Sequence, residues 1–520
     1  MRKKILLIVP ILSLLLSSCV TTSGSSQPSK SSNLNSDSFV SSETNLSSQI
    51  GDTSLPISSN NVSSLSSDNS STSQSGNAVR LEIFALNDMH GNVYDSSNGL
   101  GIAKTATLLK SYPKNVNNAL YVSQGDMWQG SAASNLTRGQ LVNDWMGQLH
   151  FTSMTMGNHE FDWSSSYVEE NSKNAAFPYL GINIFSRETN QRVDYLQPST
   201  VVNKNGAKIG IIGAIGDCYS SISGSMVKDI YFKVGNELTE LVKQEATRLK
   251  TEEKCDFIIY SLHDDNSYYD ASLSNGYVDL VFEGHTHKDY CIQDKYGVYH
   301  IQSAGYNQTI NYIDIELNVD DDSFVVKSTK SLRTNNYSYL NDDSEALALF
   351  DKYADVINPA NDVLGNNSRY RNSTYLRQLV ADLYLQYGTE KWGSAFNNIF
   401  LAGGYISCRS PYKLEAGPVT YADIYTLFPF DNDLVLCSIS GYYLDKQFVN
   451  STNDNYYISY TEYGSSARNS INPDDTYILI TDTYSSDYEP NHLTVISRYS
   501  DEGFYARDMI ARYVEAGNFE

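Results

Sequence analysis

The sequence predicts an α/β fold, with two folded parts that follow a long N-terminal extension. Three observations support this prediction. Short apolar runs alternate with helical patterns from residue 80 to about residue 333, a helical connection follows, and further helix and strand patterns continue to residue 520. Strands that alternate with helices are typical of layered α/β domains. A length of 520 residues leaves room for more than one such domain.

The first folded part, 79–335, contains apolar runs that we expect to be buried strands, at 81–86, 119–123, 152–156, 209–215, 257–262 and 278–282. Residues 235–254 have helical periodicity. Their apolar face is formed by Leu238, Leu241, Val242 and Leu249. We therefore expect a layered α/β domain in this part of the chain.

A connecting helix is expected within 336–360. Residues 343–357 have a helical pattern, with Asp343 or Ser344 as the candidate N-cap and Pro359 marking the end. The second folded part, 361–520, begins with an amphipathic helix and continues with shorter strand patterns. The apolar face of that helix comprises Leu376, Leu379, Val380, Leu383, Tyr384 and Tyr387. This pattern predicts a second, smaller α/β or α+β domain.

The charge balance limits the possible partners. Acidic residues outnumber basic residues by 60 to 37, for a formal net charge of −23. Such a chain repels nucleic-acid backbones and anionic membranes, so we expect no nucleic-acid polymer as a partner. If the protein binds phosphate groups, metal ions or a few arginines must supply positive charge locally.

The N-terminus indicates an exported protein. Basic residues in 1–4 precede a largely apolar run at 5–16, which is too short to span a bilayer but fits the core of a signal peptide. The run Leu16-Ser17-Ser18-Cys19 resembles a bacterial lipobox, with 1–18 as the signal peptide and Cys19 as the lipidated residue. The alternative is an ordinary cleaved signal that contains a cysteine.

Residues 19–78 are rich in serine and poor in aromatic and basic residues. Such a segment cannot bury enough apolar surface to offset its chain entropy, so we expect a flexible tether. No later segment is apolar enough to span a membrane. These features predict a protein on the bacterial cell surface, attached by a lipid anchor to the outer face of the cytoplasmic membrane.

The remaining cysteines are Cys218, Cys255, Cys291, Cys408 and Cys437. They are scattered, odd in number and without a C-x-x-C pair, which argues against a disulfide scaffold or a thiolate zinc site. Several lie within apolar runs, so buried free thiols are expected.

Histidine is the most informative residue type, because five of the eight histidines follow predicted strands. The chemistry-bearing groups after the strands are Asp88-Met89-His90, Gly125-Asp126, Asn158-His159-Glu160-Phe161-Asp162, His263 and His285-Thr286-His287. Ligands gather at the carboxyl ends of strands in α/β folds. Carboxylate, imidazole and amide groups suit Zn, Mn or Fe ions. One histidine after a strand is often a turn or capping residue, but five groups in this order favour a dinuclear metal site bridged by Asp126.

The order D-x-H, G-D, G-N-H-E, His and G-H-x-H resembles the calcineurin-like metallophosphoesterases and, more narrowly, the bacterial 5′-nucleotidase family. The resemblance extends over nearly all of 81–520. It implies a layered β-sandwich metallophosphoesterase domain with flanking helices and a smaller substrate-binding domain after it. It also implies that Asp88, His90, Asp126 and His287 bind one divalent metal ion. Asp126, Asn158, His263 and His285 would bind the other.

Two metal ions that lie close together can activate water and polarise phosphate oxygens for in-line attack on phosphorus. The resemblance implies a catalytic role for Asn158 and for the pair His159 and Asp162, in which the aspartate orients the histidine. The alternative for His159 is simple packing against its turn. We expect Glu160 to form local hydrogen bonds only.

The second domain carries the expected substrate residues. Residues 402–409 resemble the family's N-G-G-x-I-R loop, with Ala402 in place of Asn and an insertion before Arg409. The run Phe428-Pro429-Phe430-Asp431-Asn432 resembles the P-F-x-N turn, which makes Phe430 the first base-stacking ring. Either Arg369 or Arg371 would bind phosphate. Tyr484 as the second ring and Asp487 as the ribose acceptor are less specific, because both glycines of the family's G-G-D-G loop are missing.

The resemblance implies a hydrolase that releases phosphate from extracellular nucleotides, with small-molecule nucleotides as partners. A 2′,3′-cyclic nucleotide 2′-phosphodiesterase with 3′-nucleotidase activity, or a nucleotide-sugar hydrolase, would use the same scaffold. A non-catalytic surface lipoprotein that binds ligands predicts lost metal ligands, and every expected ligand is present in the sequence.

Overall fold

The computed structural model describes residues 78–97, 99–396, 399–461, 470–488, 491–499 and 504–520. All described residues belong to one compact unit, within 68–520. The expected signal peptide, Cys19 and residues 19–77 of the expected tether lie outside the described residues. Ala78, which the sequence assigned to the tether, is already the first residue of a strand.

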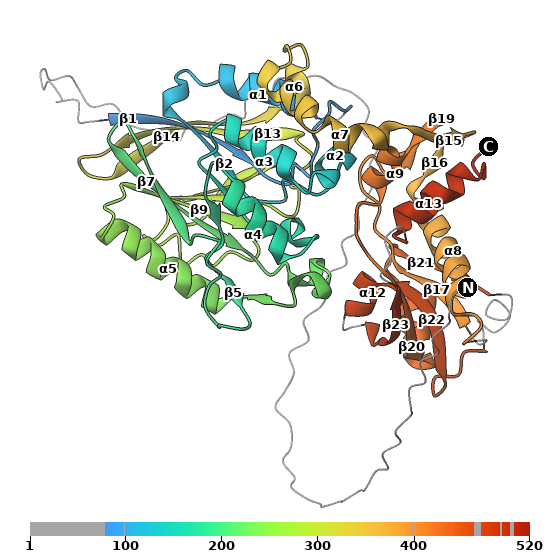
Figure 1. Ribbon diagram of the computed structural model, residues 1–520. Coiled ribbons are helices and arrows are strands. Elements are labelled where there is room, and N and C mark those ends of the chain that lie inside the picture. Colours follow the sequence, from blue (N-terminus) through green and yellow to red (C-terminus); the bar gives the residue numbers. More distant parts are fainter. Residues whose placement is uncertain (1–77, 98, 397–398, 462–469, 489–490, 500–503) are drawn as a thin grey trace, which may run out of the picture. The chain divides into compact units, whose positions relative to one another are not determined.

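Two six-stranded sheets form the core of the first domain (Figure 1). The first sheet has the order β14 (Ser323–Arg333), β13 (Thr309–Asn318), β1 (Ala78–Leu86), β2 (Ala119–Ser123), β3 (Ser153–Thr155) and β4 (Tyr179–Leu180). The second has the order β11 (Tyr290–Gln293), β12 (Tyr299–Gln302), β10 (Leu280–Glu283), β9 (Phe257–His263), β7 (Ala207–Ile215) and β6 (Ser199–Lys204). β1 to β4 are parallel, as are β7, β9, β10 and β12. The carboxyl ends of four strands therefore meet at one edge of each sheet.

The two sheets face each other across an apolar layer. Side chains from β1, β2, β7, β9 and β10 share one buried cluster, including Ile83, Val122 and Ile211. Because side chains alternate along a strand, neighbouring residues such as Phe84 point to the outer face, where helices cover the first sheet. The outer face of the second sheet packs against a helix through Val242 and Leu249. The predicted layered sandwich with flanking helices is confirmed.

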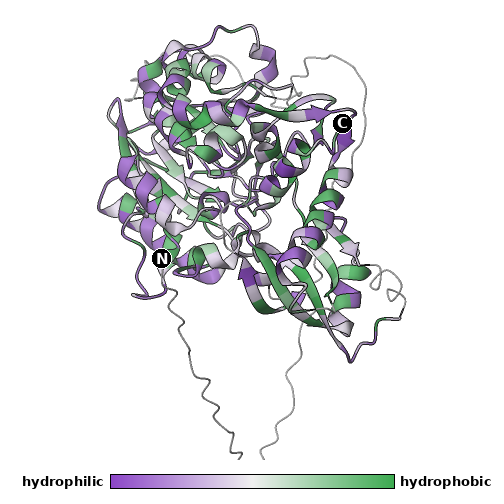
Figure 2. Ribbon diagram, turned by 45° about the vertical axis from the view of Figure 1, so that its right-hand side comes forward, coloured by the Kyte–Doolittle hydropathy of each residue, from purple (hydrophilic) through white to green (hydrophobic). Residues whose placement is uncertain are grey.

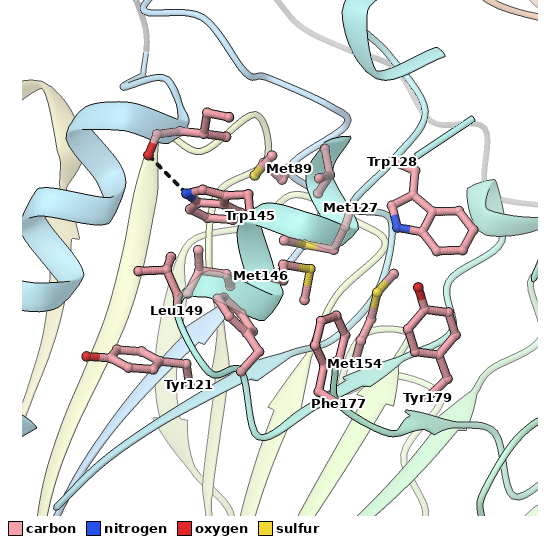
Figure 3. Close-up of a cluster of buried hydrophobic side chains, with 14 of the residues drawn as sticks. Met89, Tyr121, Met127, Trp128, Trp145, Met146, Leu149, Met154, Phe177 and Tyr179 are labelled. Carbon is pink, nitrogen blue, oxygen red and sulfur yellow. Dashed lines mark hydrogen bonds between the residues drawn. The ribbon is translucent and has the colours of Figure 1, made fainter. Parts of the chain in front are cut away.

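The helices of the first domain are α1 (Ile102–Ser111), α2 (Ala132–Leu136), α3 (Gln140–Gln148), α4 (Ser165–Asn174) and α5 (Asn236–Thr251). A small sheet pairs β5 (Ile184–Ser186) with β8 (Ile230–Phe232). Figure 3 shows part of the cluster between the helices and the first sheet, where Trp145 and Met146 of α3 pack near Tyr121 and Met154. The Trp145 ring nitrogen donates a 3.0 Å hydrogen bond to the carbonyl of Ile102, which ties α3 to α1.

The expected connecting helix is divided in two. α6 (Ser344–Lys352) and α7 (Ala354–Ile357) are separated at Tyr353, and Pro359 lies in a short 3-10 helix after them. Asp343 is the N-cap of α6, because its side chain accepts hydrogen bonds from the backbone of Glu345 and Ala346. The expectation of one continuous helix over 343–357 was therefore wrong, while the Asp343 cap is confirmed.

The second domain contains a five-stranded sheet in the order β21 (Tyr456–Tyr460), β17 (Ile399–Tyr405), β22 (Thr476–Asp482), β20 (Leu434–Ser440) and β23 (Thr494–Tyr499). Its helices are α8 (Ser373–Trp392), α9 (Tyr421–Leu427), α10 (Gly441–Tyr443), α12 (Thr483–Asp487) and α13 (Ala506–Glu515). Two small sheets pair β15 (Val363–Asn367) with β19 (Gly417–Thr420), and β16 (Arg371–Asn372) with β18 (Lys413–Leu414). Figure 2 shows apolar strands in the five-stranded sheet, and α8 packs its expected apolar face onto them, with Tyr387 only partly buried.

The cysteines in the described part of the chain are free thiols. Cys218, Cys255, Cys408 and Cys437 are buried, as expected. Cys291 is exposed, which corrects the expectation for this residue, because it lies on the sheet-edge strand β11. Among the described residues, no helix combines the length and apolar character needed to cross a membrane.

Candidate metal centre and substrate cavity

The expected metal ligands lie just beyond the carboxyl ends of five parallel strands from both sheets. Asp88 and His90 follow β1, Asp126 follows β2, Asn158 follows β3, His263 ends β9, and His285 and His287 follow β10. Five of these residues have a left-handed backbone, with φ between 48° and 69°: Asp88, His90, Asp126, His285 and His287. Residues other than glycine rarely adopt this backbone conformation, and the backbone strain that it causes is concentrated at functional sites. The chain turns sharply after each strand and aims these side chains at a common centre.

The first group of ligands is Asp88, His90 and His287. The Nε2 atoms of His90 and His287 lie 3.0 Å apart, and His287 Nε2 lies 3.4 Å from Oδ1 of Asp88. Oδ2 of Asp126 lies 4.0 Å from His90 Nε2. The three side chains are close enough to hold one ion between them.

The second group is Asn158, His263 and His285. Oδ1 of Asn158 lies 3.1 Å from His263 Nε2 and 2.9 Å from His285 Nδ1. Oδ2 of Asp126 lies 3.3 Å from His263 Nε2, so the same oxygen faces both groups. Asp126 therefore occupies the position that a bridging carboxylate requires.

Divalent metal ions bind neutral imidazoles and ionised carboxylates. Burial opposes protonation of His263, but Asp126 and then Asp88 raise its pKa to about 10, so an ion that binds there displaces a proton. Burial opposes ionisation of Asp126, but His263 and His159 hold the pKa of its carboxyl well below the ordinary value. Burial and then the charge of His263 lower the pKa of His285 to about 4. Burial and then the charge of Arg409 hold the pKa of His90 well below its usual range. The nitrogen and oxygen donors therefore fit the dinuclear centre that the sequence implied.

Backbone groups hold the ligands in place. The second ring nitrogen of His263 contacts the carbonyl of Gln124 at 2.6 Å, and that of His90 contacts the carbonyl of Gln129 at 3.1 Å. Such contacts fix the ring orientation of metal-binding histidines. Glu160 accepts hydrogen bonds from the backbone of Gly157, Asp126 and Met127, each at 2.8 Å. Its expected local hydrogen-bonding role is confirmed, since it joins the β2 and β3 loops.

His159 and Asp162 form a pair beside the metal ligands. Nδ1 of His159 lies 2.7 Å from Oδ2 of Asp162, and the backbone N–H of His159 donates to Oδ1 of Asp126 at 2.8 Å. The guanidinium of Arg409, from the second domain, contacts Nε2 of His159 and lies 3.3 Å from its Nδ1. Simple packing does not account for His159, because its ring is held between a carboxylate and a guanidinium.

A cavity of about 270 Å³ joins these groups. It is lined by Asp126, Asn158, His159, Asp162, His285 and His287 of the first domain and, among the expected substrate residues, by Arg409, Phe430 and Tyr484 of the second. The rings of Tyr484 and Tyr405 lie 5.5 Å apart at its wall. The structure thus brings the metal ligands and three expected substrate residues to one space.

Phe430 lies at this cavity and outside the buried core. Its ring is 6.1 Å from that of His159, and the Arg409 guanidinium lies 5.4 Å from the ring centre. The following residue, Asp431, accepts hydrogen bonds from Arg138 at 2.8 Å and Arg507 at 2.5 Å. These ion pairs hold the Phe430 turn in position.

Three expected substrate residues do not line the cavity. Arg369 is exposed on the surface. Arg371 is buried, where its Nε donates to Asn367 at 2.7 Å and its guanidinium lies over the Phe519 ring. Asp487 accepts hydrogen bonds from Arg498 at 2.7 Å and from the backbone of Ser225 at 3.1 Å. Neither arginine is among the residues that line the cavity, and the carboxylate of Asp487 is already paired.

Asp482 also lines the cavity, although it was not among the residues expected from the sequence. Its side chain caps α12 by accepting from the backbone of Ser485 at 2.8 Å, and it also accepts from the hydroxyl of Tyr384 at 3.1 Å. Burial raises the pKa of Asp482 to about 6. The sequence could indicate only a capping role for Asp482, because aspartate is a typical N-cap residue before a short helix. Its position in the cavity depends on how the five-stranded sheet packs.

Comparison with known families agrees with this geometry. Residues 81–289 match the calcineurin-like phosphoesterase family, and residues 356–488 match the 5′-nucleotidase C-terminal domain. The first family uses a dinuclear metal centre. The protein UshA of Yersinia enterocolitica is 25% identical over 510 residues, which cover 84% of this chain and 90% of that protein. A 5′-nucleotidase of Vibrio cholerae is 26% identical over 239 residues, 42% of each chain.

The fold is also that of solved structures. The 5′-nucleotidase precursor of Thermus thermophilus superimposes with a TM-score of 0.66 and 17% identity, over 84% of this chain and 96% of the other. The order of the two matched domains, the convergent ligands and this shared architecture support one assignment. Residues 81–289 belong to the calcineurin-like phosphoesterase family and residues 356–488 to the 5′-nucleotidase C-terminal domain family, and the chain is a metal-dependent phosphoester hydrolase with this domain order.

Proposed function

We propose that this protein is an extracellular nucleotidase that removes phosphate from nucleotides, with 5′-nucleotides as its main substrates. One observation carries the proposal. Arg409 and Phe430 of the second domain line the same cavity as Asp126, His159 and the metal-binding loops of the first. A cation for phosphate and an aromatic face for a nucleobase thus stand beside the hydrolytic centre.

In this proposal, Asp88, His90, Asp126 and His287 hold one divalent ion, of Zn, Mn or Fe type. Asp126, Asn158, His263 and His285 hold the other. When bound, the two ions supply an activated water nucleophile and polarise the phosphate oxygens. The protein holds the ligand side chains rigidly, because each ligand residue lies at or just after the end of a buried strand. It also supplies a partly enclosed space in which electrostatic interactions are stronger than in bulk water.

His159 and Arg409 act on the phosphoryl group. Asp162 orients His159 by accepting a hydrogen bond from Nδ1, which leaves Nε2 directed at the guanidinium of Arg409. On substrate binding, the phosphate oxygens take the place of His159 as acceptors for Arg409. A guanidinium binds a phosphate with paired, charge-assisted hydrogen bonds. Once Nε2 of His159 has taken up a proton from solvent, it can donate to the transferring phosphoryl group or protonate the leaving oxygen.

Phe430 and Tyr484 are proposed to contact the nucleobase. Phe430 is half-buried beside Arg409, while Tyr484 lies on the wall formed with Tyr405. An enclosed volume of about 270 Å³ suits a small ligand rather than a polymer. This size agrees with the acidic charge of the chain, which disfavours nucleic acids.

The test is phosphate release by the full chain from matched substrates, with Zn²⁺, Mn²⁺ or Co²⁺ restored after chelation. We expect 5′-nucleotides to be hydrolysed fastest. A preference for 2′,3′-cyclic or 3′-nucleotides would assign the sibling phosphodiesterase activity, and a preference for nucleotide sugars would assign a nucleotide-sugar hydrolase. No turnover of any of these with any of the ions would contradict an enzymatic role and favour a ligand-binding lipoprotein.

A further inference from the structure

Cys218 lies beside the second group of metal ligands, although it was not among the ligands expected from the sequence. Its Sγ, a ring nitrogen of His263 and a ring nitrogen of His285 all lie within 4.8 Å of one another, a spacing that can hold a metal ion. The residue is only 1% exposed. Its thiol makes one weak hydrogen bond, a 3.5 Å contact with the backbone carbonyl of His263.

The fold determines this position. β7 runs parallel to β9, with Ile215 opposite His263, so the chain leaving β7 passes the metal-binding end of β9. Gly216 donates a 3.0 Å backbone hydrogen bond to the carbonyl of His263. A Cβ atom on Gly216 would lie 1.9 Å from Oδ2 of Asp264, so only glycine allows this approach. The close approach of the two loops places Cys218 next to the imidazoles.

A second observation at the same place points to a missing ligand. Asn158, whose Oδ1 contacts both imidazoles, is fully buried and lines the cavity, yet its Nδ2 has no hydrogen-bond partner. Unpaired buried polar atoms are rare and costly. An ion at this position would bind the amide through Oδ1. The Nδ2 group is a donor and cannot bind a cation, so it would be satisfied by an acceptor held at the ion, such as a water or phosphate oxygen.

We propose that Cys218 is a sulfur ligand of the ion held by His263 and His285. The inference rests on the proposed metal site and not on the identity of the substrate. On binding, the S–H bond breaks, the proton leaves to solvent, and the sulfur donates an electron pair to the ion.

The consequence is metal selectivity at one of the two positions. Thiolate is a soft ligand that favours Zn²⁺ and Co²⁺, whereas carboxylate, carbonyl and water suit Mn²⁺ and Mg²⁺. The first group, Asp88, His90 and His287, contains no sulfur. The two positions of one centre should therefore differ in their preferred ion.

The test is the absorption spectrum of the Co²⁺-loaded full chain, in a Cys19→Ser background so that no thiol of the N-terminal segment competes. We expect a sulfur-to-cobalt charge-transfer band in the near ultraviolet that is lost in Cys218→Ser. The matched control is Cys255→Ser, which removes another buried free thiol from the same domain and should retain the band. Zn²⁺ affinity of Cys218→Ser should fall by about 10- to 100-fold, the usual effect of losing a supporting residue at a metal site. Mn²⁺ affinity should change little.

Absence of the band from the parent protein, or its persistence in Cys218→Ser, would overturn the inference. The parent spectrum decides even if the variant folds poorly. Because the spectrum is recorded without substrate, this outcome is separate from the proposed function. Nucleotide hydrolysis without the band would contradict only the sulfur ligand, whereas the band without hydrolysis would confirm the ligand and contradict only the substrate.

Discussion

The two walls of the cavity are built differently. On the metal side, each ligand stands at the end of a strand in a buried sandwich, and most adopt a strained backbone that the surrounding packing holds in place. On the substrate side, Arg409 and Phe430 lie on loops held by individual contacts, such as the ion pairs of Asp431. In the proposed function, hydrolysis therefore depends on the rigid sandwich, whereas substrate choice depends on loops that can change without loss of the fold.

The largest effect is expected on the metal side. Asp126→Asn should reduce phosphate release by about 100-fold or more, because one oxygen faces both groups of ligands and the loss of its charge weakens both. The fold should persist, since the amide is nearly isosteric. Turnover and bound metal per chain are the measurements.

Asp279→Asn is the matched control for Asp126→Asn, because it alters a carboxylate of the same domain that is not an expected metal ligand. Asp279 accepts a backbone hydrogen bond from Ile258 and pairs with Lys250. It should retain both activity and metal. Near-normal turnover and metal content in Asp126→Asn would refute a bridging role.

The next largest effect is expected at Arg409, and it differs in kind from the effect expected at Arg371. Arg409→Lys should lower kcat/KM by about 100-fold, because lysine cannot form the paired contact with phosphate. Melting temperature should change little.

Arg371→Lys should do the opposite. Its buried hydrogen bond to Asn367 would be lost at a cost of about 1–3 kcal/mol in the free energy of unfolding, with activity retained at low temperature. Activity and stability measured for both variants distinguish an arginine that binds phosphate from one that supports the fold. Loss of activity without loss of stability in Arg371→Lys would instead support the sequence-based expectation that Arg371 binds phosphate.

A smaller effect is expected from Phe430→Ala. Stacking of a base on an aromatic ring contributes about 1–3 kcal/mol, so KM for nucleotides should rise by roughly 5- to 150-fold with kcat nearly unchanged. Hydrolysis of p-nitrophenyl phosphate, which has no nucleobase, serves as the control and should change far less. Equal loss on both substrates, together with a lower melting temperature, would show that Phe430 acts by packing.

The smallest effect on catalysis is expected from Cys19→Ser, which alters neither wall of the cavity. If Cys19 carries a lipid, the variant should move from the membrane fraction to the soluble or secreted fraction with unchanged kcat and KM. Fractionation after a high-salt wash, followed by immunoblotting, measures this. A variant that stays with the membrane would show that another anchor exists.

The metal side was predictable from the sequence because its residues belong to short motifs. Each ligand follows an apolar run, and the strand at 119–123 was predicted with the bounds that the structure has. The order of the motifs then predicted a set of side chains that the structure brings together, with Asp126 between the two groups. Likewise, Asp343 was recognisable as a cap because capping depends on the backbone of the next few residues.

Sequence motifs indicated Arg409, Phe430 and Tyr484, which line the cavity, but only the tertiary structure decided the rest of the substrate side. Arg369 and Arg371 are separated by a single residue, yet one is exposed and the other is buried against Phe519, near the end of the chain. Asp487 is paired with Arg498 and Ser225, while Asp482 and Tyr405 reach the cavity from adjacent elements of the second domain. The position of Cys218 beside His263 likewise depends on the parallel pairing of β7 with β9. Strand periodicity and motif order are short-range properties that a sequence displays directly. The direction of a loop side chain depends on contacts between residues far apart in the chain, which only the packed structure determines.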